Sequence, residues 1–100
     1  MPRVTLTLPS WIAATLGAKA PGWFRIDREI AENSTIDDLL KELVAAYPGF
    51  REAVYNPDTG LPTEQVNFVL NDRLLTYRDL QQILLSEGDV IMLIPLYTGG

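Results

Sequence analysis

The chain has 100 residues, enough for one compact domain, and 47% of them are hydrophobic. It contains no cysteine and no histidine, which excludes disulfides, thiolate zinc sites and catalysis by a Cys or His side chain. The net charge is −5, from 13 acidic and 8 basic residues, and the basic residues are scattered. We therefore expect no nucleic-acid binding, since this requires a basic patch, and we favour docking onto a basic protein partner.

Membrane insertion and metal binding are also disfavoured. The longest apolar stretch, over residues 90–97, is far shorter than the roughly 20 residues that cross a bilayer, and no signal peptide is visible. Asp37-Asp38 is the only pair of adjacent acidic residues, and consecutive side chains on a helix point in different directions. We therefore interpret the pair as part of a solvated first turn of a helix and not as a metal site. We expect a cytoplasmic protein without a membrane partner or a metal site.

The N-terminal segment has the pattern of a β-hairpin. Residues 4–8 alternate apolar and polar side chains, as in a strand with one buried face, and Pro9 ends this strand. Residues 9–22 are predicted to be a long turn. Residues 23–30 then resume an extended pattern, with Phe24, Ile26 and Arg28 on one face.

The clearest signal is an amphipathic helix that starts after Ser34 or Thr35 as N-cap. Its apolar stripe consists of Ile36, Leu39, Leu40, Leu43, Val44 and Tyr47. Pro48-Gly49 ends this helix, and residues 50–55 favour a further short helical turn.

Three strands are predicted in the second half, over residues 65–70, 73–75 and 90–94. A turn-rich loop over residues 56–62 precedes the first of them. Asn71-Asp72 forms a tight turn, residues 77–85 favour a short helical turn, and residues 87–89 turn the chain into the last strand.

This order of elements predicts an α+β domain of the β-grasp, or ubiquitin-like, type. We expect a mixed sheet of about five strands, with one main helix on one face and with the first and last strands paired in parallel. The domain is expected over residues 1–95. Residues 96–100 are expected to form a flexible functional tail that ends in Gly-Gly.

The tail is a candidate reactive group, because Gly99-Gly100 lies at the C-terminus only a few residues after the last strand. A tail without side chains can enter a narrow channel in an activating enzyme and adopt any backbone angle. Pro95 is expected to lift the tail off the sheet, and Leu96 and Tyr97 to anchor it.

These residues resemble the MoaD/ThiS family of ubiquitin-like sulfur carriers, and most of all its cysteine-biosynthesis branch. The segments that carry the resemblance are residues 4–9, 43–49, 66–72 and 88–100. The resemblance implies that a partner adenylyltransferase of the E1 type uses ATP and magnesium to adenylate the Gly100 carboxylate. A sulfur donor then converts the adenylate to a thiocarboxylate, and a sulfur-accepting synthase takes the sulfur. Gly99, which has no side chain, would let Gly100 enter the active site of the partner. The chain itself has no phosphate loop and is expected to bind no cofactor.

The partner is expected to contact the last strand and the tail. Alternation sends Ile91 and Leu93 to one face and Met92 and Ile94 to the other. We predict that Met92 and Ile94 lie outside, near Val69, and that they bind the partner together with Leu96, Tyr97 and Thr98. Strand parity alone leaves open the alternative that Met92 and Ile94 are core residues.

Two other functions stay open at this point. The chain could be a ubiquitin-like modifier joined to lysines through Gly100, or an interaction domain whose terminal glycines are incidental. A self-contained enzyme is the least favoured, so the chain is interpreted as a protein co-substrate or the small subunit of a sulfur-transfer complex. The sulfur acceptor also stays open among cysteine, molybdopterin, thiamine and tRNA-base chemistry.

Overall fold

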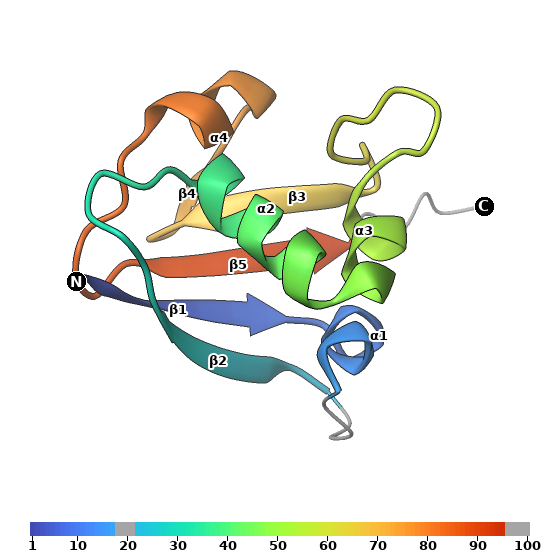
Figure 1. Ribbon diagram of the computed structural model, residues 1–100, viewed down its shortest axis with the longest axis horizontal. Helices are drawn as coiled ribbons and strands as arrows, with labels where there is room; N and C mark the ends of the chain where they lie inside the picture. The colour runs from blue at the N-terminus through green and yellow to red at the C-terminus, as the bar shows by residue number, and fades with distance from the viewer. Residues whose placement is uncertain (18–21, 96–100) are drawn as a thin grey trace.

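The computed structural model describes residues 1–17 and 22–95, which form one mixed five-stranded sheet with helices packed on it (Figure 1). The strands are β1 (Arg3–Leu8), β2 (Phe24–Glu29), β3 (Val66–Leu70), β4 (Arg73–Leu74) and β5 (Val90–Pro95). Their order across the sheet is β2-β1-β5-β3-β4. β1 and β5 pair in parallel, and the other neighbours pair antiparallel. The predicted α+β, β-grasp arrangement is therefore confirmed.

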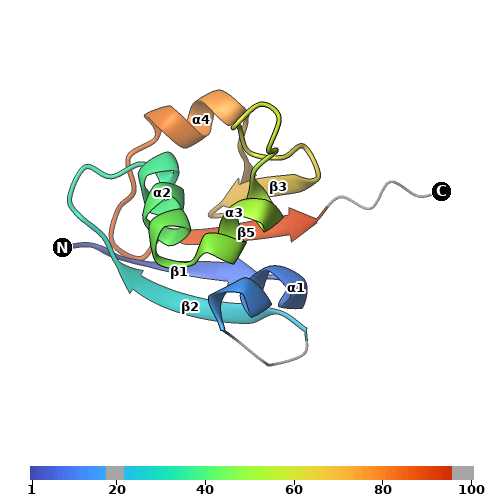
Figure 2. The same ribbon diagram turned by 45° about the vertical axis from the view of Figure 1, so that its right-hand side comes forward.

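The helices are α1 (Ser10–Ala13), the 3-10 turn η1 (Ala14–Leu16), α2 (Ile36–Ala46), α3 (Pro48–Val54) and α4 (Tyr77–Gln82). Figures 1 and 2 show α2 and α3 lying over the same face of the sheet. β3 and β5 bury every second residue against this layer, as Val66, Phe68 and Leu70 of β3 do.

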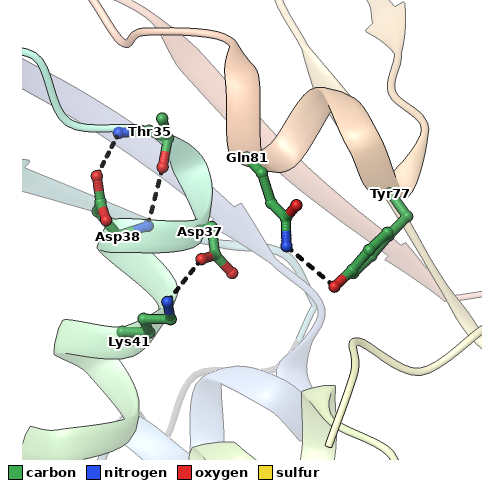
Figure 3. Close-up of polar contacts among 6 residues, drawn as sticks. All are labelled: Thr35, Asp37, Asp38, Lys41, Tyr77 and Gln81. Atoms are coloured by element: carbon green, nitrogen blue, oxygen red, sulfur yellow. Dashed lines mark hydrogen bonds and ion pairs between the residues drawn. The ribbon is translucent and has the colours of Figure 1, made fainter.

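The start of α2 is defined by a capping box. The Thr35 hydroxyl accepts a hydrogen bond from the Asp38 backbone N–H at 3.2 Å, and Asp38 accepts one from the Thr35 N–H at 3.0 Å (Figure 3). This reciprocal pair satisfies two of the N–H groups at the helix start. Thr35, and not Ser34, is therefore the N-cap.

The predicted apolar stripe of α2 supplies the centre of the core. Ile36, Leu39, Leu40 and Leu43 are buried, whereas Val44 and Tyr47 pack at the margin and are partly exposed. The buried side chains of β1 and β5 lie beneath them in the same cluster. A helix with this spacing gains most of its stability from such burial.

The prediction of a long turn over residues 9–22 was wrong for its first half. Residues 10–16 form α1 and η1, because the Pro9 carbonyl accepts hydrogen bonds from the N–H groups of Ile12 and Ala13 at 3.1 and 2.9 Å. Ile12 and Ala13 are fully buried, and this burial stabilises a helical turn too short to persist alone. Gly17, at φ +89°, ends the turn.

Other boundaries shift for similar reasons. Pro48 opens α3, which is seven residues long, because proline suits the first position of a helix. Leu75 is buried outside β4, which is one residue shorter than predicted.

Pro95, which we expect to lift the following tail off the sheet, itself lies within the sheet. It is the last residue of β5 and pairs in register with Val66 of β3. A proline is tolerated at a strand end because few ladder donors are needed there. The predicted tail, residues 96–100, lies outside the described residues.

Replacing Leu43 by alanine should remove a side chain that is only 1% exposed at the helix–sheet interface. We expect the free energy of unfolding to fall by about 2–5 kcal/mol, measured by urea denaturation. The exposed Glu42→Ala, one residue earlier on α2, serves as control and should change it by less than about 0.5 kcal/mol. Equal losses in the two variants would contradict the proposed core.

Candidate docking surface and tail

The central strand β5 presents different residues to its two faces. Ile91 and Leu93 are fully buried beneath the helices, whereas Val90, Met92 and Ile94 alternate with them and are half-buried. The structure thus places Met92 and Ile94 on the side opposite α2. We call this side the open face.

An apolar row crosses the open face. Met92 pairs with Val69 of β3 on one side and with Thr7 of β1 on the other. Val69 in turn pairs with Leu74 of β4, whose side chain is 63% exposed. Directly paired residues of a sheet point to the same side, so these side chains form a continuous surface. Ile94 lies on the same face, opposite Asn67.

Sequence reasoning named Met92, Ile94 and Val69 but missed Leu74. A signal for Leu74 was available in the tight turn at Asn71-Asp72. A two-residue hairpin loop fixes the register of the two strands, so the second residue before the turn, Val69, pairs with the second residue after it, Leu74. The turn has the expected geometry, with φ of 48° at Asn71 and 70° at Asp72.

A shallow hollow of about 260 Å³ lies beside the apolar row. Val69, Val90 and Met92 provide its apolar wall, and Asn71 and Asp72 provide its polar rim. An apolar centre with a polar rim is the usual composition of a protein contact site. The hollow can receive an apolar side chain of a partner.

The β1–β2 side of the open face is polar. The Thr5 hydroxyl donates a hydrogen bond to Asp27 at 2.7 Å, and Arg3 lies 3.6 Å from Glu29. Such exposed contacts contribute little to stability. They do mark the border of the apolar row, which is confined to β3, β4 and β5.

A polar clamp fixes where β5 begins. The Asp89 carboxylate accepts hydrogen bonds from the Ser86 N–H at 2.7 Å and from the Asn71 side chain at 2.9 Å. Asn71 also accepts one from the Val90 N–H at 2.9 Å. Gly88, at φ +86°, makes the turn possible. The clamp joins the β3–β4 hairpin to β5 and so sets the register of the strand that precedes the tail.

The remaining predicted site residues, Leu96, Tyr97, Thr98, Gly99 and Gly100, lie outside the described residues. They follow Pro95 directly in the sequence, and Pro95 ends β5, the middle strand of the sheet.

Two further properties concern residues 1–17 and 22–95 only. No helix among them is long and apolar enough to span a bilayer. No three acidic side chains among them gather closely enough to hold a metal ion.

Comparison with known proteins identifies the family. The ThiS family model matches residues 18–100, which include the apolar row, the clamp and the terminal glycines. The chain belongs to the ThiS family. No curated protein matches it.

Solved structures share the fold of this ThiS-family chain. Small archaeal modifier protein 1 of Haloferax volcanii is 21% identical, with a TM-score of 0.71 and coverage of 97% of this chain and 100% of that one. CysO of Mycobacterium tuberculosis is 20% identical, with a TM-score of 0.70 and coverage of 94% and 99%. CysO of Amycolatopsis orientalis, solved in complex with BexX, is 17% identical, with a TM-score of 0.69 and coverage of 97% and 99%.

Removing the Asp89 carboxylate tests the clamp. We expect Asp89→Ala to lower the free energy of unfolding by about 1–2 kcal/mol, because two hydrogen bonds to a charged group are lost. Urea denaturation measures the loss. The exposed Glu64→Ala is the charge-matched control and should be nearly neutral. If Asp89→Ala were as stable as this control, the clamp would not fix the strand.

Proposed function

We propose that the chain is a sulfur carrier whose reacting group is the C-terminal carboxylate of Gly100. The observation that carries this proposal is the ThiS-family match, which runs through the terminal Gly99-Gly100. The fold supports it, since β5, the strand that precedes the tail in the sequence, is central in the sheet and carries part of the apolar row on its open face. The chain acts as a co-substrate of its partners in this account.

The chemistry requires an activated carboxylate. In the proposed first step, a carboxylate oxygen of Gly100 attacks the α-phosphorus of ATP, and pyrophosphate leaves. A sulfur nucleophile then attacks the carbonyl carbon of this acyl-adenylate and displaces AMP. With sulfide as this nucleophile the product is a thiocarboxylate, and its sulfur then displaces a leaving group from an electrophilic acceptor, which gives a thioester. Hydrolysis of the resulting acyl group restores the carboxylate.

The two terminal glycines suit this sequence of steps. An activating enzyme must contact the reacting carbon from several directions, and a side chain at Gly99 or Gly100 would occupy part of that space. We assign Leu96, Tyr97 and Thr98 to the contact with the mouth of the partner's channel. ATP and magnesium belong to the partner, an adenylyltransferase of the E1 type.

The open face is assigned to partner docking. Leu74, Val69 and Met92 form its apolar row, and Ile94 lies toward the tail. These side chains would contact the partner while the tail enters the partner's active site. The net charge of −5 favours a basic rim on that partner. A sulfur-accepting synthase would use the same tail and, in turn, the same face.

A ubiquitin-like modifier would begin from the same adenylate. It differs in the fate of Gly100, which would be joined to a lysine of another protein by an isopeptide bond. The small archaeal modifier protein shares the fold but, at 21% identity, does not favour this route. The experiment that follows separates the two.

Incubation with ATP, magnesium, sulfide and an extract of the source organism should create a thiol-reactive group on the chain. Because the sequence has no cysteine, any labelling by a thiol-selective reagent must come from a new sulfur. We expect the label on Gly100, found by mass spectrometry, and none on a variant that lacks Gly99-Gly100. Isopeptide adducts to lysines without any thiol labelling would overturn the carrier proposal in favour of the modifier.

A charge placed in the apolar row should weaken docking. We expect Leu74→Asp to raise the KM of the adenylyltransferase for the carrier at least tenfold, measured by ATP–pyrophosphate exchange, because a carboxylate would be desolvated at the interface. Leu84→Asp is a matched control: Leu84 is also an exposed leucine, at 53%, and lies outside the row. Equal KM values for the two variants would show that the open face is not the docking site.

A further inference from the structure

A second concave site lies on the helix side of the molecule. It is a pocket of about 350 Å³ between α2, α3, α4 and the loop that follows α3. Charged, aromatic and amide side chains line it, namely Asp37, Lys41, Arg51, Tyr55, Tyr77 and Gln81. This volume lies at the small end of the range for pockets that bind organic molecules. The open face and the proposed sulfur chemistry do not use it.

The pocket is positively charged, although the whole chain carries −5. Lys41 pairs with Asp37 at 2.9 Å across one turn of α2, as Figure 3 shows. The hydrogen bond and charge of Asp37 raise the pKa of Lys41, so the ammonium group stays protonated. Over residues 1–17 and 22–95, no carboxylate lies within ion-pair distance of Arg51. One acid against two bases leaves a net charge of about +1 in the pocket.

The two tyrosines add hydrogen-bond donors. The Tyr77 hydroxyl accepts a hydrogen bond from the Gln81 amide at 3.0 Å, which leaves its own proton free to donate (Figure 3). The Tyr55 hydroxyl is buried and has no hydrogen-bond partner among the described residues. Burial raises the pKa of Tyr55 to about 12, so this hydroxyl is a donor at neutral pH. A buried donor without an acceptor is unusual in a folded protein.

Donors therefore outnumber acceptors in the pocket. Arg51, Lys41 and the two tyrosine hydroxyls can donate, while the one carboxylate, Asp37, is already paired. Val44 and Pro62 give the pocket an apolar wall beside these groups. A matching ligand has one anionic acceptor group and an apolar body. A doubly charged phosphate fits less well, since it would exceed the net charge and face Asp37.

We propose that this pocket binds a small carboxylic acid with an apolar or aromatic body. The carboxylate would accept hydrogen bonds from the Arg51 guanidinium, which suits bidentate pairing, and from a tyrosine hydroxyl. The body of the acid would lie against Val44 and Pro62. The site is a small-molecule site in this proposal, because its volume admits a compact acid more readily than a folded segment of a partner.

Benzoate is the probe, titrated into the full-length ¹⁵N-labelled chain and followed by the amide NMR spectrum. We expect saturable shifts that concentrate at Lys41, Val44 and Gly60, with a dissociation constant of about 1 mM. Benzamide has nearly the same shape without the charge and should bind at least tenfold more weakly. Similar affinities for the two compounds, or no saturable shift with benzoate, would overturn the proposal.

Two variants test the assigned donors. Arg51→Gln should weaken benzoate binding at least fivefold, whereas Arg25→Gln, the same change of charge on β2, should leave it unchanged. Tyr55→Phe should preserve or raise the melting temperature of the free protein, because it removes an unpaired buried hydroxyl, and should weaken benzoate binding. An equal effect of Arg51→Gln and Arg25→Gln would show that binding follows net charge only and would contradict the site.

Discussion

The parallel pairing of β1 with β5 is the constraint on which the rest of the structure depends. It brings the two ends of the domain together at the centre of the sheet, with Leu6 beside Ile91 and Thr7 beside Met92. Parallel strands need a long crossover, and the chain between them supplies α2 and the whole β3–β4 hairpin. The C-terminal residues therefore follow the middle strand of the sheet directly in the sequence.

The same strand separates the two faces of the protein. Ile91 and Leu93 close the core under α2, while Met92 and Ile94 join the open face. Because the clamp at Asp89 and Asn71 fixes the start of β5, it also fixes which residue pairs with Val69 and where the tail begins. A slip of one residue would exchange core and surface side chains along the whole strand. The register of β5 thus determines both the core and the composition of the open face.

Periodicity made most of the fold predictable. The stripe of α2 and the alternation of β1 and β3 were visible in the sequence because each of these elements buries one face, whereas β5 has no polar residue to mark its exposed face. The turn over residues 10–16 was missed because burial of Ile12, which is a tertiary effect, decides its conformation. The sheet face on which Met92 lies, and the place of Leu74 beside Val69, became known only from the strand pairing.

The helix-side pocket was not predictable, since Tyr55, Arg51 and Tyr77 lie apart in the sequence and meet only after the helices pack. The chemistry of Gly100 rests on the family match, because the tail lies outside the described residues.

The central claim is that Gly100 cycles between a carboxylate and a thiocarboxylate. The most direct measurement is mass spectrometry of the intact chain and its C-terminal peptide, purified from the source organism under conditions that preserve acyl sulfur. The account predicts a fraction of chains in which one oxygen of Gly100 is replaced by sulfur, and predicts that this fraction falls when sulfur is withheld from the cells. A Gly100 that is always either a free carboxylate or an isopeptide to lysine would contradict it.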